Sequence, residues 1–246
     1  MGYHESLTEG RNAVLEAFRS GKTVDRLFVL DGCQDGPVKM ILREAKKQDT
    51  MVQYVKKERL DQLSETKNHQ GVIAYCAACE YAEVSDILEN AKKKGEAPFI
   101  VLLDGIEDPH NLGAIIRTAN QAGAHGVIIP KRRAVGLTAT VARTSAGAVN
   151  YTPVAKVTNL VTVMEDLKKE GMWFVCADMD GEEMYSLNLK GPIGLVIGNE
   201  GEGVSRLVKE HCDMVASIPM KGDIDSLNAS VAMGVLAYEI VRQRRF

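Results

Sequence analysis

Long apolar runs are missing from this sequence. No stretch reaches the roughly 18 consecutive apolar residues that a membrane-spanning helix needs. Residues 1–5 lack the basic start and apolar core of a secretory signal. Cysteine is scarce and odd in number, with five in 246 residues, which is typical of reduced thiols in a cytosolic protein. We therefore expect a cytoplasmic protein with no membrane segment.

Metal-ligand spacing is also missing. Cys76 and Cys79 form a lone CxxC pair, and no second pair or suitably spaced histidine completes a zinc site. A redox pair would open a helix, whereas this pair follows the strand-like residues 71–75. We expect packing thiols and no metal.

Basic residues are not in excess over the whole chain. The 30 Lys and Arg against 33 Asp and Glu give a net charge of −3, which argues against a nucleic-acid binder. The average hides a local imbalance, because residues 109–164 contain no acidic residue. The basic residues of that window are Arg117, Lys131, Arg132, Arg133, Arg143 and Lys156. Residues 131–143 are interpreted as a phosphate-binding rim, with a solvated basic loop as the alternative.

Ordinary globular composition, with 45% hydrophobic and 26% charged residues, excludes a disordered or collagen-like chain. Strand and helix patterns alternate along it. Strands are expected at 26–30, 51–55 and 71–75, and helices at 10–19 and 36–47. A helix at 84–94 ends in three lysines before Gly95, which indicates a linker. The predicted domains are 1–78 and 97–246, joined by a linker at 79–96.

The second domain begins with the apolar run 99–104, typical of a strand buried on both faces of a parallel sheet. Further strands are expected at 126–129, 173–177, 194–197 and 214–218. Helices are expected at 112–122, 160–170, 204–210 and 227–243. This pattern predicts an α/β domain with an open parallel sheet, which binds ligands at the carboxyl ends of its strands.

Three strand-to-helix turns carry candidate functional residues. In the first, Asn111 is a candidate helix cap, and Arg117 follows less than two turns later. In the second, glycines at 198, 201 and 203 lack the dinucleotide spacing, and Glu200 and Glu202 would repel phosphate. That turn favours an uncharged or cationic ligand, with a purely structural turn as the alternative. In the third, Ser226 is the expected cap, with Asn228 in the first helical turn.

These motifs, in this order, resemble the catalytic domain of SpoU/TrmH-type SPOUT RNA 2′-O-ribose methyltransferases. They are Asn111 with Arg117-Thr118-Ala119, the run Gly198-Asn199-Glu200-Gly201-Glu202-Gly203, and Ile218-Pro219-Met220 followed by residues 226–232. Residues 1–78, with Gly10-Arg11-Asn12 and His69-Gln70-Gly71, are similar to the small ribosomal-protein-like α/β RNA-binding domain of the RlmB subgroup.

The resemblance implies a deep trefoil knot in the second domain, bound S-adenosylmethionine, and a homodimer with the C-terminal helix at its interface. Cofactor contacts are expected at Gly198, Ile218, Met220 and Leu227. RNA contacts are expected at Arg11, Asn12, Lys131, Arg132, Arg133 and Arg143.

The resemblance also makes Arg117 the central catalytic residue. Because arginine stays protonated in proteins, we expect a clamp on phosphate and the 2′-oxygen rather than a base. Asn111 and Glu200 would orient Arg117, and Ser226 and Asn228 would position substrate or the motif loops.

The expected activity is methyl transfer to the ribose 2′-hydroxyl of a guanosine in 23S rRNA. Two alternatives stay open: a tRNA 2′-O-methyltransferase, and a non-catalytic RNA-binding or ribosome-assembly protein. The second leaves the Glu200 turn unexplained. A nucleotide-dependent oxidoreductase is disfavoured, because neither domain has a GxGxxG after its first strand.

Overall fold

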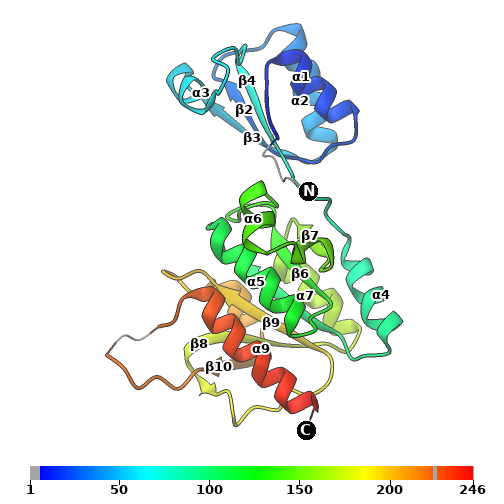
Figure 1. Ribbon diagram of the computed structural model, residues 1–246, viewed down its shortest axis with the longest axis vertical. Coiled ribbons are helices and arrows are strands. Elements are labelled where there is room, and N and C mark those ends of the chain that lie inside the picture. Colours follow the sequence, from blue (N-terminus) through cyan, green and yellow to red (C-terminus); the bar gives the residue numbers. More distant parts are fainter. Residues whose placement is uncertain (1–5, 224–225, 246) are drawn as a thin grey trace. The chain divides into compact units, whose positions relative to one another are not determined.

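The computed structural model describes residues 6–223 and 226–245 and divides into two compact units (Figure 1). One unit runs to Glu80 and includes Gly136–Ala139, and the other holds Tyr81–Val135 and the chain from Thr140 onward. Residues 1–5, where no secretory signal is expected, lie outside the described part. Within that part, no helix is long and apolar enough to cross a membrane.

The first unit is a four-stranded sheet covered on both faces. Its strand order is β1 (Ser6–Glu9), β4 (Val72–Cys76), β2 (Val24–Leu30), β3 (Met51–Val55), with only β2 and β3 parallel. Helices α1 (Arg11–Arg19) and α2 (Gly36–Lys47) bury Val14 and Ile41 on one face. Helix α3 (Lys57–Leu63) packs Leu60 against Phe28 and Ile73 on the other. The sequence did not predict β1 and α3, which are too short to show a clear period.

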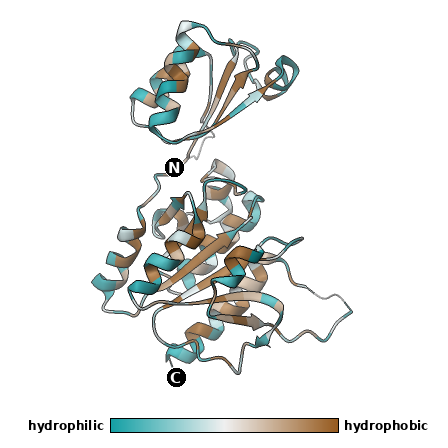
Figure 2. Cartoon of the chain, turned by 180° about the vertical axis from the view of Figure 1, so that it is seen from behind, coloured by the Kyte–Doolittle hydropathy of each residue, from teal (hydrophilic) through white to brown (hydrophobic). Residues whose placement is uncertain are grey.

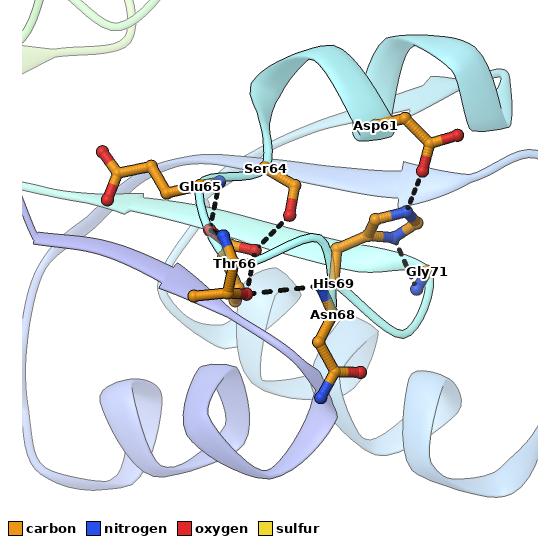
Figure 3. A network of polar contacts seen from close by, with 8 residues as sticks. Asp61, Ser64, Glu65, Thr66, Asn68, His69 and Gly71 are labelled. Carbon is orange, nitrogen blue, oxygen red and sulfur yellow. Dashed lines mark hydrogen bonds and ion pairs between the residues drawn. The ribbon is translucent and has the colours of Figure 1, made fainter.

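A carboxylate fixes the loop between α3 and β4 (Figure 3). Glu9 accepts hydrogen bonds from the Ser64 hydroxyl, the Glu65 amide (2.7 Å), and the amide and hydroxyl of Thr66 (3.2 and 2.8 Å). Burial raises the pKa of Glu9, but these hydrogen bonds to the charged form outweigh it and hold the pKa below its ordinary value. The loop is therefore anchored to the end of β1.

The same loop is held at its other end by His69. The Gly71 amide donates to Nδ1 of His69 at 3.0 Å, so the neutral ring carries its proton on Nε2, which faces Asp61 at 3.0 Å. With both ends fixed, the connection into β4 has a defined shape.

The second unit contains a six-stranded sheet in which every neighbouring pair is parallel. The order is β10 (Met214–Ser217), β8 (Trp173–Glu183), β9 (Ile193–Gly198), β5 (Phe99–Asp104), β6 (Gly126–Pro130), β7 (Val154–Val157). This confirms the predicted open parallel α/β fold. The four-residue strand β7 was not predicted. The knot stays a prediction.

Helices cover both faces of this sheet. Their bounds are α4 (Val84–Lys94), α5 (Pro109–Gln121), α6 (Ala139–Thr144), η1 (Ala148–Asn150), α7 (Leu160–Lys169), α8 (Arg206–Glu210) and α9 (Ala229–Arg245). Helices α4, α7 and α8 share one core with the sheet, while α5 and α9 contact each other (Figure 1). Figure 2 shows hydrophobic residues along the central strands, as expected for a sheet covered on both faces.

Most of the predicted linker, residues 79–96, belongs to the second unit, which corrects that prediction. Its helix α4 forms where expected, but Ile87 and Ala91 are fully buried, and Ile87 belongs to the core of the second unit. A Cβ on Gly126 would lie 2.5 Å from Ile87, so β6 approaches this helix closely. The exposed lysines at its end suggested a linker, whereas its buried face makes it part of the second unit.

A buried histidine makes the second unit sensitive to acid. His125 accepts a hydrogen bond from the Phe99 amide (2.9 Å) and faces Glu96 (3.1 Å). Burial, then the charge of Lys94, lowers the pKa of His125, although Glu96 opposes them. The unfolded chain binds this proton near pH 6.5 and the folded chain resists it. Stability should therefore fall as pH drops below about 6.5.

Urea unfolding between pH 7 and 5 tests this expectation. The unfolding midpoint of the wild type should fall with pH more steeply than that of His125→Asn, which removes the titrating ring. Parallel curves for the two proteins would contradict it.

Candidate active site

Three loops meet at one edge of the parallel sheet. β5 ends at Asp104 before α5, β9 ends at Gly198 before the loop Asn199–Gly203, and β10 ends at Ser217 before the segment leading to α9. β5 and β9 are neighbours, with Asp104 opposite Gly198. Because all strands are parallel, these loops emerge at the carboxyl edge, where such sheets bind ligands.

Hydrogen bonds join the three loops through Glu200. Its Oε1 accepts from Nδ2 of Asn111 at 2.9 Å and from Nδ2 of Asn228. Nδ2 of Asn228 also donates to Oδ1 of Asn111 at 2.9 Å. The structure thus brings together three of the five predicted catalytic residues, one from each loop. We call Asn111, Glu200 and Asn228 the amide–carboxylate cluster.

The helix caps differ from the predicted ones, and the difference builds this cluster. Asp108, not Asn111, caps α5 by accepting from the His110 amide at 2.9 Å. Asn111 then lies in the first turn with its side chain available to Glu200. At α9, Asn228 rather than Ser226 accepts from the Ser230 amide, at 2.9 Å. Ser226 precedes the helix and lines a cavity.

The loop Asn199–Gly203 is closed by its own backbone. Asn199 and Gly203 exchange two hydrogen bonds of 3.2 and 3.1 Å, and Oδ1 of Asn199 accepts from the amides of Gly201 and Glu202. A Cβ on Gly198 would lie 1.9 Å from the carbonyl carbon of Gly203. Glycine at 198 is therefore required for the loop to fold back on its strand.

Two cavities share this loop as a wall. The larger, of about 800 Å³, is lined by all four predicted cofactor residues, Gly198, Ile218, Met220 and Leu227, and by Ser226. The smaller, of about 490 Å³, lies against the loop after β5 and is lined by Asn111 and Arg133. Both volumes suit small-molecule ligands. Within the described ranges, no group of three or more metal-ligating side chains occurs.

Sequence reasoning missed the contribution of β8 to the larger cavity. β10 pairs with β8 in two pieces, Val215 with Cys176 and then Ala216 with Glu182, so residues 177–181 leave the ladder. This excursion carries Asp178 and Met179 to the cavity wall. It depends on pairing between distant strands, and no local sequence signal reports it.

Asp178 is fixed in that excursion by Lys209, at 2.7 Å. Burial raises the pKa of Asp178, but the ion pair with Lys209 and local backbone hydrogen bonds outweigh it and lower the pKa. The group is therefore a carboxylate at neutral pH, held at the cavity wall as an ion pair with Lys209.

Arg117 lies apart from the cluster. It is exposed on α5, lines neither cavity, and has no hydrogen-bond or ion-pair partner among the residues that the structure describes. Six residues along an α-helix correspond to about 240° of rotation and about 9 Å of rise from Asn111. Asn111 and Glu200 contact Asn228 instead of orienting Arg117 as expected.

The predicted RNA contacts are dispersed. Arg132, Arg133 and Arg143 are exposed, and Lys131 is half-buried. In the first unit Asn12 is exposed. Arg11 is engaged internally: it pairs with Asp35 at 2.5 Å, and its Nε donates to the Gln70 carbonyl at 3.0 Å. That guanidinium ties the starts of α1 and α2 to the loop before β4.

Comparisons with known proteins match each of the two units. The profile of the SpoU rRNA Methylase family matches residues 98–238, and that of RNA 2′-O ribose methyltransferase substrate binding matches residues 7–82. YacO of Bacillus subtilis, named for the TrmH family of tRNA/rRNA methyltransferases, is 49% identical over 237 residues, covering 96% of this chain and 94% of YacO.

Two solved structures extend the comparison. The SpoU methyltransferase AviRb from Streptomyces viridochromogenes, in complex with the cofactor AdoMet, is 27% identical, with a TM-score of 0.61 over 97% of this chain and 90% of AviRb. The A. aeolicus TrmH/SpoU tRNA modifying enzyme is 28% identical, with a TM-score of 0.56 over 65% of this chain and 84% of that enzyme.

The close approach at Gly198 predicts a binding defect. In Gly198→Ala the new methyl group must displace the Gly203 backbone, which forms a wall of both cavities. We expect affinity for S-adenosylmethionine to fall at least tenfold in calorimetric titration. Gly201→Ala is the matched control, since its Cβ would meet only Oδ1 of Asn199 at 3.7 Å. Equal affinity in the two variants would refute the requirement.

Proposed function

Because the chain belongs to the SpoU family of RNA 2′-O-methyltransferases, which use S-adenosylmethionine, we propose that it methylates the ribose 2′-hydroxyl of a guanosine in 23S rRNA. The observation that carries this proposal is the amide–carboxylate cluster, which lies where two ligand-sized cavities share a wall. A protein that only bound RNA would not need such an arrangement.

In this proposal the larger cavity holds S-adenosylmethionine. Its lining combines apolar side chains, Met220 and Leu227, with the carboxylates of Asp178, Glu183 and Glu200. Apolar contact suits the adenine ring, and carboxylates favour a cation while repelling phosphate. Gly198 and Ile218 would approach the adenosine part through their backbone, since a glycine lets a ligand come close.

Methylation of the 2′-hydroxyl requires that the reacting atoms are aligned and that the hydroxyl proton is lost. Bound S-adenosylmethionine supplies an electrophilic methyl group on a cationic sulfur. The protein must place the 2′-oxygen in line with that methyl group and stabilise charge on the oxygen as its proton passes to solvent water. Asn111, Glu200 and Asn228 would hold the three loops in register for this alignment, and Ser226 would position the substrate from the cavity wall.

Arg117 would act as an electrostatic clamp. Its guanidinium is exposed and has no protein partner in the described ranges, so it is available to an RNA phosphate and the 2′-oxygen. An arginine cannot serve as the base at neutral pH, because it remains protonated. The charge it carries would stabilise the developing alkoxide.

We assign RNA contacts to both units. The first unit matches a substrate-binding family, and Arg11 and Asn12 lie at the start of its first helix. In the second unit, Lys131, Arg132, Arg133 and Arg143 come from the acid-free window and would hold phosphates. Cytoplasmic RNA is the corresponding substrate pool.

We also propose a homodimer. One face of α9 leaves Val231 and Tyr238 about half exposed, at 49% and 51%. Tyr185 adds a third exposed side chain, at 60%. Large apolar side chains gathered on one helix and near its end suit burial against a second copy.

The RNA class is tested by mapping 2′-O-methyl groups in a strain that lacks the gene. We expect one guanosine of 23S rRNA to lose its methyl group and to regain it on incubation with purified protein and S-adenosylmethionine. A missing tRNA methyl group would instead support the tRNA alternative, which the resemblance to the A. aeolicus tRNA modifying enzyme keeps open. Complete methylation of both RNAs would favour the non-catalytic alternative.

Loss of the clamp should impair turnover without affecting the cofactor. We expect Arg117→Ala to lower kcat on RNA by a factor of about 10² to 10³, as for the loss of a single charge-stabilising donor. S-adenosylmethionine affinity should stay unchanged, because Arg117 lies outside the larger cavity. Arg206→Ala, at an exposed arginine of α8, is the control. Near-normal turnover by the Arg117 variant would rule out the clamp.

A further inference from the structure

The smaller cavity has no role in the mechanism above. It holds about 490 Å³ and shares the wall Asn199–Gly203 with the larger cavity. A ligand here would therefore lie next to a cofactor bound beyond that wall. Asn111 and Glu200, from the amide–carboxylate cluster, also line it.

The lining of this cavity combines an apolar side chain with acidic ones. Ile106 lies beneath the lining and is only 3% exposed. The charged residues of the lining are Asp104, Glu107, Asp108, Glu200, Glu202 and Arg133. Five acceptor-only carboxylates against one cation disfavour phosphate and favour a ligand with N–H donors.

Three of those carboxylates already have protein donors. Asp104 accepts from the Ser205 amide at 2.8 Å, Asp108 caps α5, and Glu200 holds the two asparagines. The side chains of Glu107 and Glu202 are exposed, and neither carboxylate has a hydrogen-bond or ion-pair partner among the described residues. These two carboxylates are therefore available to a ligand. Glu107 lines the smaller cavity only, whereas Glu202 lines both cavities.

A planar ligand with adjacent N–H donors on one edge matches the free carboxylate of this lining. Guanine has that form, because its Watson–Crick edge presents N1–H beside the N2 amino group, and two donors suit the two oxygens of one carboxylate. Adenine and cytosine offer a single amino group on that edge, and uracil a single N–H. RNA-modifying proteins read unstacked bases through this edge.

Resting on the proposed function, we propose that the smaller cavity receives the base of the target nucleotide and that Glu107 reads the N1–H and N2 amino donors of guanine. The 2′-hydroxyl is attached to the same nucleoside, so a base in this cavity brings its ribose to the shared wall. Arg133 supplies the one cationic donor of the lining.

The test compares Glu107→Gln with Glu165→Gln. Glu165 is an exposed carboxylate of α7 that lines neither cavity. Both variants and the wild type act on total RNA from a strain lacking the gene, and the RNA is then digested to nucleosides for mass spectrometry. We expect 2′-O-methylguanosine as the product. For Glu107→Gln we expect about a tenfold lower kcat/KM for RNA, through KM, as for loss of one bidentate base contact.

Two further readouts exclude a merely structural effect. The thermal midpoint and the S-adenosylmethionine affinity of Glu107→Gln should equal those of the wild type and of Glu165→Gln. Wild-type kcat/KM in Glu107→Gln, or methylation of a different nucleoside, would overturn the assignment of the cavity and leave RNA methylation intact. Failure of the wild type to methylate any RNA would overturn the proposed function, and this inference with it.

Discussion

The active-site region depends on one hydrogen-bonded carboxylate. Glu200 accepts the side-chain amides of Asn111 and Asn228, residues that lie 89 and 28 positions away in the sequence. This carboxylate thus joins all three loops at the edge of the sheet. Such networks gain strength from mutual polarisation, and loss of Glu200 would leave only the hydrogen bond between Asn228 and Asn111. A single side chain therefore connects loops that line both cavities.

The Glu200 carboxylate reaches both amides because the ends of β5 and β9 and the loop after β9 lie close together. Parallel pairing places the end of β9 beside the end of β5, and Gly198 lets the following loop fold back onto its own strand. Asp104 at the end of β5 then accepts the Ser205 amide, which fastens the loop's far end at 2.8 Å. The position of Glu200 thus follows from sheet topology and one glycine, before any ligand is considered.

The sequence predicted correctly those helices and strands whose bounds depend on neighbouring residues alone. Helices α2 and α4 and strand β5 have the expected bounds, because their apolar periods and flanking residues agree. The short elements β1, α3 and β7 hold too few residues for a period. Asp108 displaced Asn111 as a cap because Pro109 fits the first helical position. Tertiary packing alone determines that α4 joins a core and that residues 177–181 leave the sheet.

The cavities and the acid-free window, residues 109–164, carry charges of opposite sign. Both cavities are lined by carboxylates, so neither suits phosphate. Residues 109–164 carry six basic residues and no acidic ones, and Arg117 and Arg132 are exposed there. A protein that reads a base in an acidic cavity must hold the RNA backbone elsewhere, since phosphate contacts position and base contacts specify. In the proposed function, the net charge of −3 sums acidic residues that line the cavities and basic residues that hold the RNA backbone. It therefore gives no measure of affinity for RNA.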